Sequence, residues 1–299
     1  MKRVRVYQVD SFTTTPFSGN PAGVVPNADG LSEAQMKGLA RELNNSETAF
    51  MLAPDGPDHE LRVRFFTPTT EVPSCGHATI AAHYVRAVEK GLASGTVVHK
   101  IGAGVLPVEI RRTDAGLWIG MVQGAVELGT PFEGEIRREI LQTLGLAADT
   151  VDERCPVQIV STGHSKVLVG IRSTETLHTM SPDSSGLAAL SRRIGCNGYF
   201  VFVLTPQEDV LAHGRMFAPA IGIAEDPVTG NANGPLGAYL VAHGLAKPTG
   251  NHLSFRARQG EAMGRPGTVE VDVDIEDGRP HRVRVGGHAV IIFQTEVEI

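Results

Sequence analysis

Short runs of apolar residues that alternate with polar ones make up most of the first half of the chain. They lie between Gly, Pro and Asp residues at positions 2–10, 49–53, 61–66, 96–102, 105–112 and 117–122. Alternation with a period of two places successive side chains on opposite faces of a strand, one toward a core and one toward solvent. The first half is therefore predicted to be mostly β-sheet.

Two helices are predicted among these strands. Ser32 and Gln35 have the spacing of a capping box at the start of the first helix. Its apolar residues recur on one face, at Met36, Leu39, Ala40 and Leu43. The second helix starts near Gly76, ends before Gly91 and is apolar on most sides, which is typical of a buried helix. A buried helix among many strands indicates a sheet that curls around it.

The second half of the chain repeats this order. The string "SETAFML" (46–52) is similar to "CNGYFVF" (196–202), "RFFTP" (64–68) to "RMFAP" (215–219), and "CGHAT" (75–79) to "TGNAN" (229–233). These matches, and the strings "KGL" and "HGL" that follow them, have nearly the same offset. The period is too long for a solenoid repeat, so it predicts a tandem duplication that forms two similar domains facing each other.

The repeat also sets the expected domain boundaries. We predict a first domain over residues 1–125 and a second over 126–287, with a Gly/Pro-rich link at 123–135. The second half should contain a short helix at 134–144 and a central helix at 231–243. The last strand, at 288–299, either stays with the second domain or crosses back to the first.

Composition excludes several classes of function. The chain has 299 residues, a net charge of −6 and no block of Lys or Arg, so neither nucleic acid nor an anionic membrane is an expected partner. No apolar run approaches the ~18 residues that span a membrane, and the N-terminus lacks the apolar region of a signal peptide. Three cysteines argue against a disulfide framework and favour a reducing, cytoplasmic setting.

No familiar cofactor motif is present. The sequence contains no dinucleotide fingerprint, no phosphate-binding loop and no cysteine or histidine pair with zinc spacing. A lone lysine such as Lys166 does not identify a pyridoxal phosphate site. We therefore expect chemistry without a cofactor or a metal.

Both predicted central helices begin with glycine, at Gly76 and Gly230. The free N–H groups and positive dipole end of a helix start attract anions, and glycine lets a ligand approach the backbone closely. If the two domains face each other, both starts point into one cleft, which would suit a small substrate that carries a carboxylate. The plainer interpretation is that these glycines only cap turns.

The side chains around the two helix starts differ. The repeat aligns Glu47 with Asn197 and His77 with Asn231, and Asp226 lies in a loop that is longer in the second half. An acid or base together with a His–Asp pair would form a plausible proton-transfer set. Taken singly, these residues could also be a loop acid, a helix cap and a turn residue.

Cys75 has two interpretations as well. A thiol beside a helix N-terminus can be reactive, but a racemase with two thiols would need a second one, and the repeat aligns Cys75 with Thr229. We therefore predict that Cys75 is buried and structural, as are Cys155 and Cys196.

Four strings carry a family resemblance over essentially the whole chain. They are "DSFTTTPFSGNPAGVV", "LNNSETAFML", "VRFFTPTTEVPSCGHATIAAHYV" and "RMFAPAIGIAEDPVTGNANGPLGAYL". Together they resemble the PhzF family of phenazine-biosynthesis-like proteins, and their amino-acid sequences are most similar to its YddE-type bacterial branch. The resemblance implies an α+β protein with the diaminopimelate-epimerase-like fold: two pseudo-symmetric domains, each a β-barrel around a central helix. It also implies a homodimer.

The resemblance further implies an isomerase without a cofactor, since phenazine-pathway members isomerise trans-2,3-dihydro-3-hydroxyanthranilate. Glu47 matches the family's proton-shuttling acid, and His77 and Asp226 match its other two active-site positions. Gly76 and Gly230 match glycines that line the substrate site.

Other positions bear on the substrate. Asn231 departs from the serine usual in the phenazine enzymes, and "CGHAT" departs from their "AGHP", so the substrate need not be theirs. Ser46 and Asn20, which lie in the quoted strings, complete the predicted substrate-binding residues together with Asn231. Cys75 matches a catalytic cysteine of the epimerases themselves, here without its partner.

Three functional hypotheses remain at this point. The first is an isomerase in which Glu47, in the cleft between the domains, moves a proton on a small carboxylate. The second is an epimerase or racemase of an amino or hydroxy acid. The third is a module that binds a small molecule or a protein and has kept the fold without turnover.

Overall fold

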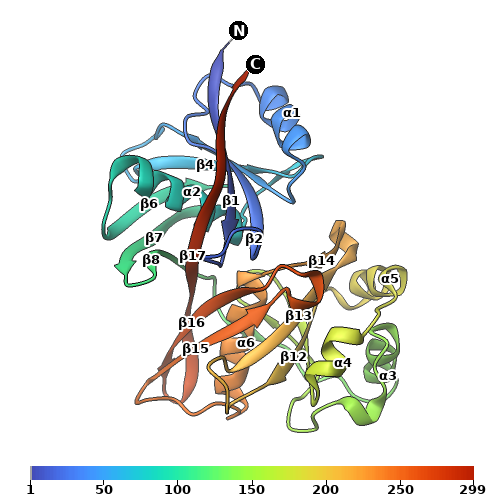
Figure 1. The fold of residues 1–299 in the computed structure, drawn as a ribbon. Coiled ribbons are helices and arrows are strands. Elements are labelled where there is room, and N and C mark those ends of the chain that lie inside the picture. The colour runs from blue at the N-terminus through green and yellow to red at the C-terminus, as the bar shows by residue number, and fades with distance from the viewer. Residues whose placement is uncertain (1) are drawn as a thin grey trace. The chain divides into compact units, whose positions relative to one another are not determined.

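The computed structural model describes residues 2–299, which divide into two compact units (Figure 1). The first unit comprises the chain up to Val122 together with Gly286–Ile299, and the second comprises Gln123–Val285. Each unit combines many strands with few helices, so the predicted α+β class is confirmed. None of the helices within residues 2–299 is both long and apolar enough to cross a membrane.

The strands of the first unit close into a barrel. They are β1 (Arg3–Ser11), β2 (Asn20–Val25), β3 (Thr48–Leu52), β4 (Leu61–Phe66), β6 (Gly95–Ile101), β7 (Gly104–Thr113), β8 (Gly116–Val122) and the second part of β17 (Arg279–Glu298); a short strand, β5 (Glu71–Val72), pairs with β4. Each strand pairs with the next in this order, and β17 closes the ring by pairing with both β8 and β1. Two of these pairs, β2–β3 and β4–β6, are parallel and need a helix as the crossover.

Those crossovers are the two predicted helices of the first half. Helix α1 (Glu33–Leu43) has the predicted capping box, in which Ser32 and Gln35 bond each other's backbone N–H groups. Its apolar face packs on a cluster that includes Phe50 and Phe66. Helix α2 (Gly76–Lys90) is buried over most of its length and contacts β1, β2, β3, β7 and β8, so it fills the barrel (Figure 1).

The second unit repeats this order with additional helices. Its elements are β9 (Glu127–Leu128), α3 (Gly134–Thr143), β10 (Gln158–Ser161), β11 (Lys166–Ile171), α4 (Thr174–Thr179), α5 (Ser184–Ile194), β12 (Tyr199–Leu204), β13 (Ala212–Ala218), β14 (Ile223–Asp226), α6 (Gly230–Ala242), β15 (His252–Gln259), β16 (Gly267–Glu276) and the first part of β17. The pairs β11–β12 and β13–β15 are again parallel. Helix α6 takes the central, buried place of α2, while α3 and α5 pack on the opposite face of the sheet.

The Gly/Pro-rich segment at 123–135 is more than a link. Glu127 and Leu128 pair with β10, and the N–H groups of Gly124 and Gly129 donate to Thr162 and Ile159 in 2.9 and 2.8 Å hydrogen bonds. Backbone pairing of this kind requires no alternation of side chains, which is why the sequence pattern did not reveal it.

The strand β17 takes part in both units. Residues Ala289 to Glu298 pair antiparallel with β1, from Ser11 to Arg3. The first part of β17, from Arg279 to Val285, belongs to the second unit and follows the turn after β16. Gly286 is the first residue of β17 that belongs to the first unit. A Cβ at this position would lie 2.1 Å from the indole of Trp118, so a larger residue cannot occupy it without moving Trp118.

The barrel registers correct one detail of the predicted repeat. Phe50 pairs with Arg64 in the first unit, and Val201 pairs with Arg215 in the second. Phe50 therefore corresponds to Val201, and our alignment with Phe200 was wrong by one residue. Phe200 points to the other face of β12, where it stacks on Phe202. In the corrected alignment of the two units, Glu47 corresponds to Gly198 rather than to Asn197.

The two arginines in this register form the same ion pair in each unit. Arg64 holds Glu71 through two hydrogen bonds of 2.7 and 2.6 Å, and Arg215 holds Glu225 through two of 2.8 Å. Each glutamate lies on the short strand that precedes the central helix. The duplicated pair therefore fixes the segment that leads into the helix start.

Candidate active site

The first candidate group of side chains lies at the start of α2. Ser46 and Glu47 end the loop between α1 and β3, and the carbonyl of Glu47 accepts a 3.3 Å hydrogen bond from Gly23 of β2. Cys75 is the N-cap of α2, and His77 lies in its first turn. The loop and the helix start thus bring residues about thirty positions apart into contact.

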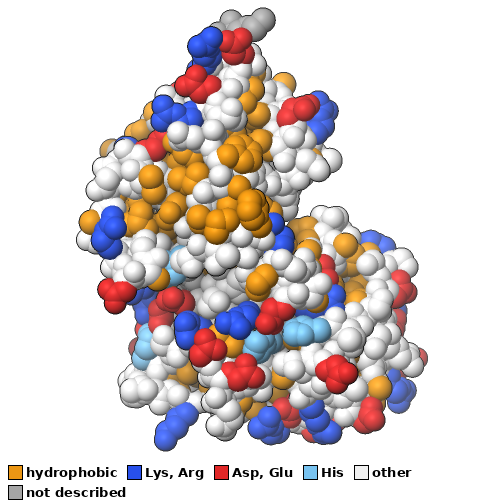
Figure 2. Space-filling view, in the orientation of Figure 1, with side chains coloured by type: hydrophobic (Ala, Val, Ile, Leu, Met, Phe, Trp, Pro, Cys, Tyr) orange, Lys and Arg blue, Asp and Glu red, His pale blue; other side chains and the backbone are white. Residues whose placement is uncertain are grey.

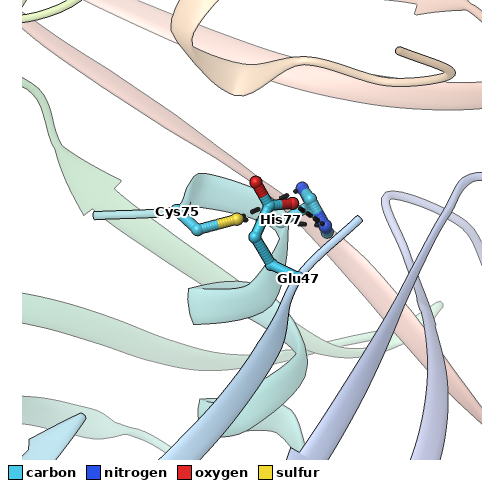
Figure 3. A group of neighbouring side chains, drawn as sticks. All are labelled: Glu47, Cys75 and His77. Atoms are coloured by element: carbon cyan, nitrogen blue, oxygen red, sulfur yellow. Dashed lines mark hydrogen bonds and ion pairs between the residues drawn. The ribbon is translucent and has the colours of Figure 1, made fainter. Parts of the chain in front are cut away.

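His77 is the centre of this group (Figure 3). Its Nε2 lies 3.4 Å from a carboxylate oxygen of Glu47 and 3.3 Å from the hydroxyl of Ser46, and its Nδ1 lies 3.4 Å from the thiol of Cys75. Glu47, His77 and Cys75 are each less than 10% exposed. The imidazole therefore bridges a carboxylate and a thiol in a buried setting.

Buried polar groups fix the helix start against β1. Ser11 donates a 2.8 Å hydrogen bond to the carbonyl of His77, and Thr79 donates a 2.7 Å bond to the carbonyl of Cys75. Asn20, a predicted substrate-binding residue, pairs with Ser11 in the β1–β2 ladder and is fully buried. The Ser11 bond ties the first turn of α2, which carries His77, to β1.

Gly76 leaves open space at the same helix start. Apart from its chain neighbours and the backbone of its own helix, no heavy atom of residues 2–299 would lie within 4 Å of a Cβ built on Gly76, and the backbone of Gly76 is not left-handed. Neither a strained turn nor a close neighbour therefore explains glycine here. The open space is consistent with a ligand lying against the helix N-terminus.

This arrangement can move protons. An imidazole has one nitrogen that donates and one that accepts, or two that donate when charged. It can donate a hydrogen bond to the Glu47 carboxylate, and it can pass a proton between that carboxylate and its other neighbours. Cysteine, histidine and glutamate are also zinc ligands, and one ligand atom of each lies within 4.8 Å of the others.

The second group of polar side chains lies at the start of α6, in the other unit. The Asp226 carboxylate accepts a hydrogen bond from the hydroxyl of Thr229, the N-cap of α6. The Gln259 side chain donates to the carbonyl of Asp226 at 2.7 Å and accepts from the N–H of Thr229 at 3.1 Å. Asn233 donates to the same Gln259 oxygen. Asp226 is thereby fixed at the helix start.

Two further features mark this helix start. Asn231 interrupts the helical geometry, and its carboxamide oxygen is buried with no hydrogen-bond partner in the part of the chain that the structure covers. Gln123 donates a 3.1 Å hydrogen bond to the carbonyl of Gly230 and accepts one from Thr162. Neither Cys75 nor Thr229, the two N-caps, bonds its helix backbone through its side chain.

The structure thus brings the predicted site residues together in two groups. Ser46, Glu47 and His77 form one, with Asn20 behind the helix start. Asp226, Gly230 and Asn231 form the other. Within the first unit, the carboxylate beside His77 is that of Glu47. The pair expected between His77 and Asp226, which belong to different units, stays a prediction. Gln259, which fixes Asp226, was missed because it lies on β15, about thirty residues from the motif.

Comparison with known proteins identifies relatives over the whole chain. Residues 9–295 match the sequence profile of phenazine biosynthesis-like proteins, PhzC-PhzF. An uncharacterized isomerase of Clostridium acetobutylicum is 51% identical over 298 residues, 99% of each chain. The uncharacterized isomerase YddE of Escherichia coli K12 is 49% identical, over 98% of this chain and 97% of its own. A trans-2,3-dihydro-3-hydroxyanthranilate isomerase of Pseudomonas chlororaphis is 30% identical, over 94% and 95% of the two chains.

Solved structures show the same fold. A PhzF-family phenazine biosynthesis protein of Bacillus anthracis superposes with a TM-score of 0.90 at 32% identity, covering all of both chains. A hydroxyproline epimerase of Agrobacterium vitis superposes with a TM-score of 0.66 over 99% of this chain and 91% of its own. Its 12% identity supports a common fold alone. The predicted diaminopimelate-epimerase-like fold is confirmed.

Proposed function

The chain belongs to the phenazine biosynthesis-like PhzC-PhzF family of isomerases, and we propose that it moves a proton on a small carboxylate substrate without a cofactor. In this proposal Glu47 is the general acid and base. The observation that supports it best is the 3.4 Å approach of the Glu47 carboxylate to the His77 imidazole in a site where both are buried.

Glu47 first acts as a base. Its carboxylate removes a proton from a carbon of the substrate that an adjacent unsaturated or carbonyl group acidifies, and the electron pair moves into that group. Glu47 then returns the proton to a different carbon of the same conjugated system. The proton and both electrons stay within substrate and carboxyl group, so the reaction needs no oxidant, reductant or external acid.

His77 positions the carboxylate in this proposal. Donation from Nε2 holds the ionised Glu47 in one orientation before the reaction, and Cys75 and Ser46 complete the contacts of the ring. A buried carboxylate has few competing water contacts, which strengthens its interaction with a substrate proton. The carbonyl of His77, bonded to Ser11, keeps this geometry fixed while the proton moves.

The substrate class follows from the helix starts and from the departures from the phenazine enzymes. Gly76, Gly230 and Asn231 would bind polar groups of the substrate, and a carboxylate suits the positive end of a helix. Asp226, held by Thr229 and Gln259, would accept a hydrogen bond from a substrate hydroxyl or amino group. Asn231 replaces a serine of the phenazine enzymes, so we propose a related carboxylate rather than their own substrate.

A screen in D₂O tests the proposal. Purified protein is incubated with trans-2,3-dihydro-3-hydroxyanthranilate, diaminopimelate, proline and related cyclic acids, and each compound is analysed by mass spectrometry. We expect deuterium to enter one compound together with a shift of its double bond. Binding of a compound with neither exchange nor rearrangement would instead favour the binding module.

An epimerase is the second candidate, because the thiol of Cys75 lies against the same imidazole as Glu47. A thiol is the other common acid–base group for a carbon next to a carboxylate. Inversion of a stereocentre needs groups on both faces of that carbon, and the position that corresponds to Cys75 is Thr229. Solvent deuterium at a stereocentre, with loss of optical activity and no double-bond shift, would identify this activity.

A further inference from the structure

The side chains of Glu47, Cys75 and His77 combine three kinds of group that bind zinc in proteins: a carboxylate, a thiol and an imidazole (Figure 3). They come from two segments of the first unit, the loop before β3 and the first turn of α2. Within residues 2–299, no other group of three His, Cys, Asp or Glu side chains brings its ligand atoms within 4.8 Å of one another. The proposed mechanism uses the carboxylate of this group and gives its thiol no chemical task.

The ligand atoms have nearly the spacing that one ion requires. Zinc bonds to nitrogen and oxygen are about 2.0–2.2 Å long and those to sulfur about 2.3 Å, so ligand atoms of a tetrahedral site lie roughly 3.3–3.7 Å apart. Nε2 of His77 lies 3.4 Å from a carboxylate oxygen of Glu47 and 3.9 Å from the sulfur of Cys75. Only a small movement of the sulfur or the ring separates this arrangement from a chelate.

Other histidines that contact two carboxylates are arranged differently. In His59, His213 and His252 one carboxylate lies against Nδ1 and the other against Nε2. These two nitrogens face away from each other, so one ion cannot bind a ring nitrogen and both oxygens there. At His77 the same nitrogen is close to both the sulfur and the carboxylate, which is what a chelate requires.

The charges of the three ligands suit a divalent cation in a buried place. A thiolate and a carboxylate together cancel the two positive charges of the ion, and a neutral imidazole completes the set, so no net charge is buried. This balance is needed because the positive end of α2 would repel a cation that is not neutralised. Cys75 is the N-cap of α2, yet its side chain does not bond the helix backbone and lies 3.4 Å from Nδ1 of His77 instead.

The helix start also has room for a fourth ligand. Glu47, Cys75 and His77 are each 7 or 8% exposed, so the group is not sealed from solvent. Gly76, which lies between two of the ligands along the chain, has open space on its Cβ side, and the hydroxyl of Ser46 lies 3.3 Å from Nε2 of His77. A water in that space or the Ser46 hydroxyl would complete a tetrahedral site, since zinc bound by three protein ligands keeps one position for water or substrate.

We propose that Glu47, Cys75 and His77 form an inhibitory site for Zn²⁺, in which the ion binds the carboxylate that is proposed to move the proton. The inhibition rests on the proposed function, whereas the binding does not. When the ion binds, the thiol proton leaves to solvent and a Zn–S bond forms beside bonds to Nε2 and the carboxylate; no electron is transferred. Mg²⁺ and Ca²⁺ should not compete, because they prefer oxygen ligands.

Binding is tested first without a substrate, with Co²⁺ as a coloured substitute for Zn²⁺. Metal-free full-length protein is titrated with CoCl₂, whose charge-transfer absorption reports a bond to a thiolate, and ZnCl₂ then displaces the cobalt. We expect one ion per chain, not displaced by excess MgCl₂, in wild type and in the control Cys196→Ser, which changes a buried thiol of the second unit. Cys75→Ser should lose the absorption.

The other two ligands are tested through the affinity for zinc, measured by competition with a coloured chelator. Glu47→Gln and His77→Gln should each bind Zn²⁺ at least about a hundredfold more weakly than wild type, because loss of an outer partner of a ligand already costs about 10–100-fold. The melting temperature of each metal-free variant, expected to be close to that of wild type, shows that it is folded.

Inhibition is tested on the compound that exchanges in D₂O. At a zinc concentration about ten times the measured Kd, one-site binding leaves about a tenth of the chains free, so exchange by wild type and Cys196→Ser should fall about tenfold. A chelator should restore it. The effect is expressed as the ratio of rates with and without zinc in the same variant, and in Cys75→Ser this ratio should stay close to one.

The proposal is overturned if cobalt gives no thiolate absorption in wild type, if Cys75→Ser retains it, or if zinc binds without slowing exchange. If one variant does not fold, the remaining two decide by the same criteria. Zinc binding that depends on these side chains, without deuterium exchange in any compound, would support the ion site and reject the proposed function. Exchange that depends on Glu47, in a protein that binds no zinc, would do the reverse.

Discussion

Glu47 and Gly198 occupy the same position in the two barrels, immediately before the strand that follows the first crossover. In the first unit this position carries a carboxylate held against His77. In the second it carries no side chain, and a Cβ there would lie 2.6 Å from the carbonyl of Phe217. A duplicated backbone therefore supports acid–base chemistry in one unit, while the other has no room for the same group.

Replacement of Cys75 distinguishes the two enzyme hypotheses. In Cys75→Ser a hydroxyl takes the place of the thiol beside Nδ1 of His77, so the ring keeps a hydrogen-bonding neighbour. If Glu47 alone moves the proton, kcat should stay within about tenfold of wild type, whereas loss of a catalytic acid or base costs about 10²–10⁴-fold. Steady-state kinetics on the compound found in the D₂O screen gives the answer, and a loss above a hundredfold would favour the epimerase.

Replacement of Gly76 tests the space at the helix start. Gly76→Ala adds a methyl group where no neighbour was found within 4 Å, and alanine is the better helix former by about 1 kcal/mol. The variant should therefore melt no lower than wild type but bind substrate more weakly, with KM raised at least about tenfold. A matched change in α1, Gly38→Ala at a partly buried position, also has open space and should leave KM unaltered. Normal KM in Gly76→Ala would contradict a ligand at this position.

For single residues, the sequence predicted which side chains belong to the site better than it predicted which side chains they contact. Ser46, Glu47 and His77 were predicted as site residues and lie together. The partner of His77 was not predictable, because its distance to Glu47 depends on how α2 packs in the barrel.

Among the elements, α2 and β6 share a buried histidine pair. Nε2 of His83 lies 3.1 Å from Nδ1 of His99, and their side chains are almost fully buried. Burial lowers the pKa of His99 to about 4 and, together with the charges of His99 and Arg86, lowers that of His83. Both rings are therefore neutral in the folded protein at the pH where the unfolded chain protonates its histidines.

This pair makes stability depend on pH in a definite direction. The unfolded histidines bind protons below about pH 6.5. Folded His99 does not do so until about pH 4, and the pKa of folded His83 is lowered as well, so stability is fully present above pH 6.5 and falls as the pH decreases. His99 alone should cost about 2 kcal/mol at pH 5 relative to pH 7. Urea unfolding at both pH values measures this. In His99→Gln the difference should shrink, and in the exposed control His281→Gln it should not. An unchanged pH dependence in His99→Gln would show that the pair does not set it.

Periodicity predicted most elements of the first half, because β1, β3, β4, β6, β7 and β8 alternate clearly and α2 ends at Gly91 in a left-handed turn. It missed β2, where Pro21 and Gly23 interrupt the alternation although both lie in the ladder with β1. It also missed α4, a short helix of six residues, and α5 (Ser184–Ile194), which corresponds to α1 as the crossover before the next parallel strand but shares no matched string with it.

For the molecule as a whole, β17 is the strand on which both units depend. Its second part lies between β1 and β8 in the first barrel. A chain that ends at Gly287 would leave that barrel open and expose the core side of β1, so we expect loss of its folded structure. Proteolysis and circular dichroism would show cleavage within residues 2–122. Deletion of the last two residues alone should have little effect, and a stable first unit without residues 288–299 would contradict this role.

The duplication was visible in the sequence because strings with a matched phenylalanine, proline and glycines stand at nearly equal offsets. The one-residue error at Phe50 arose because a match of residue type was preferred over the strand register, which only pairing with Arg64 and Arg215 reveals. The homodimer stays a prediction that light scattering can test. Apolar side chains do gather on one face of the first unit (Figure 2), and Phe17 and Phe293 are 71% and 48% exposed.

The most direct test of the account is the pair of variants Glu47→Gln and Glu42→Gln, measured on the compound that exchanges in D₂O. Gln keeps the shape of Glu47 but cannot accept and return a proton, whereas Glu42 is exposed at the end of α1 and serves as the control. Deuterium incorporation should fall at least about 10³-fold in Glu47→Gln, with the affinity for the compound and the melting temperature close to wild type, and should not change in Glu42→Gln. Exchange at the wild-type rate in a folded Glu47→Gln variant would contradict the role of Glu47 as the acid and base.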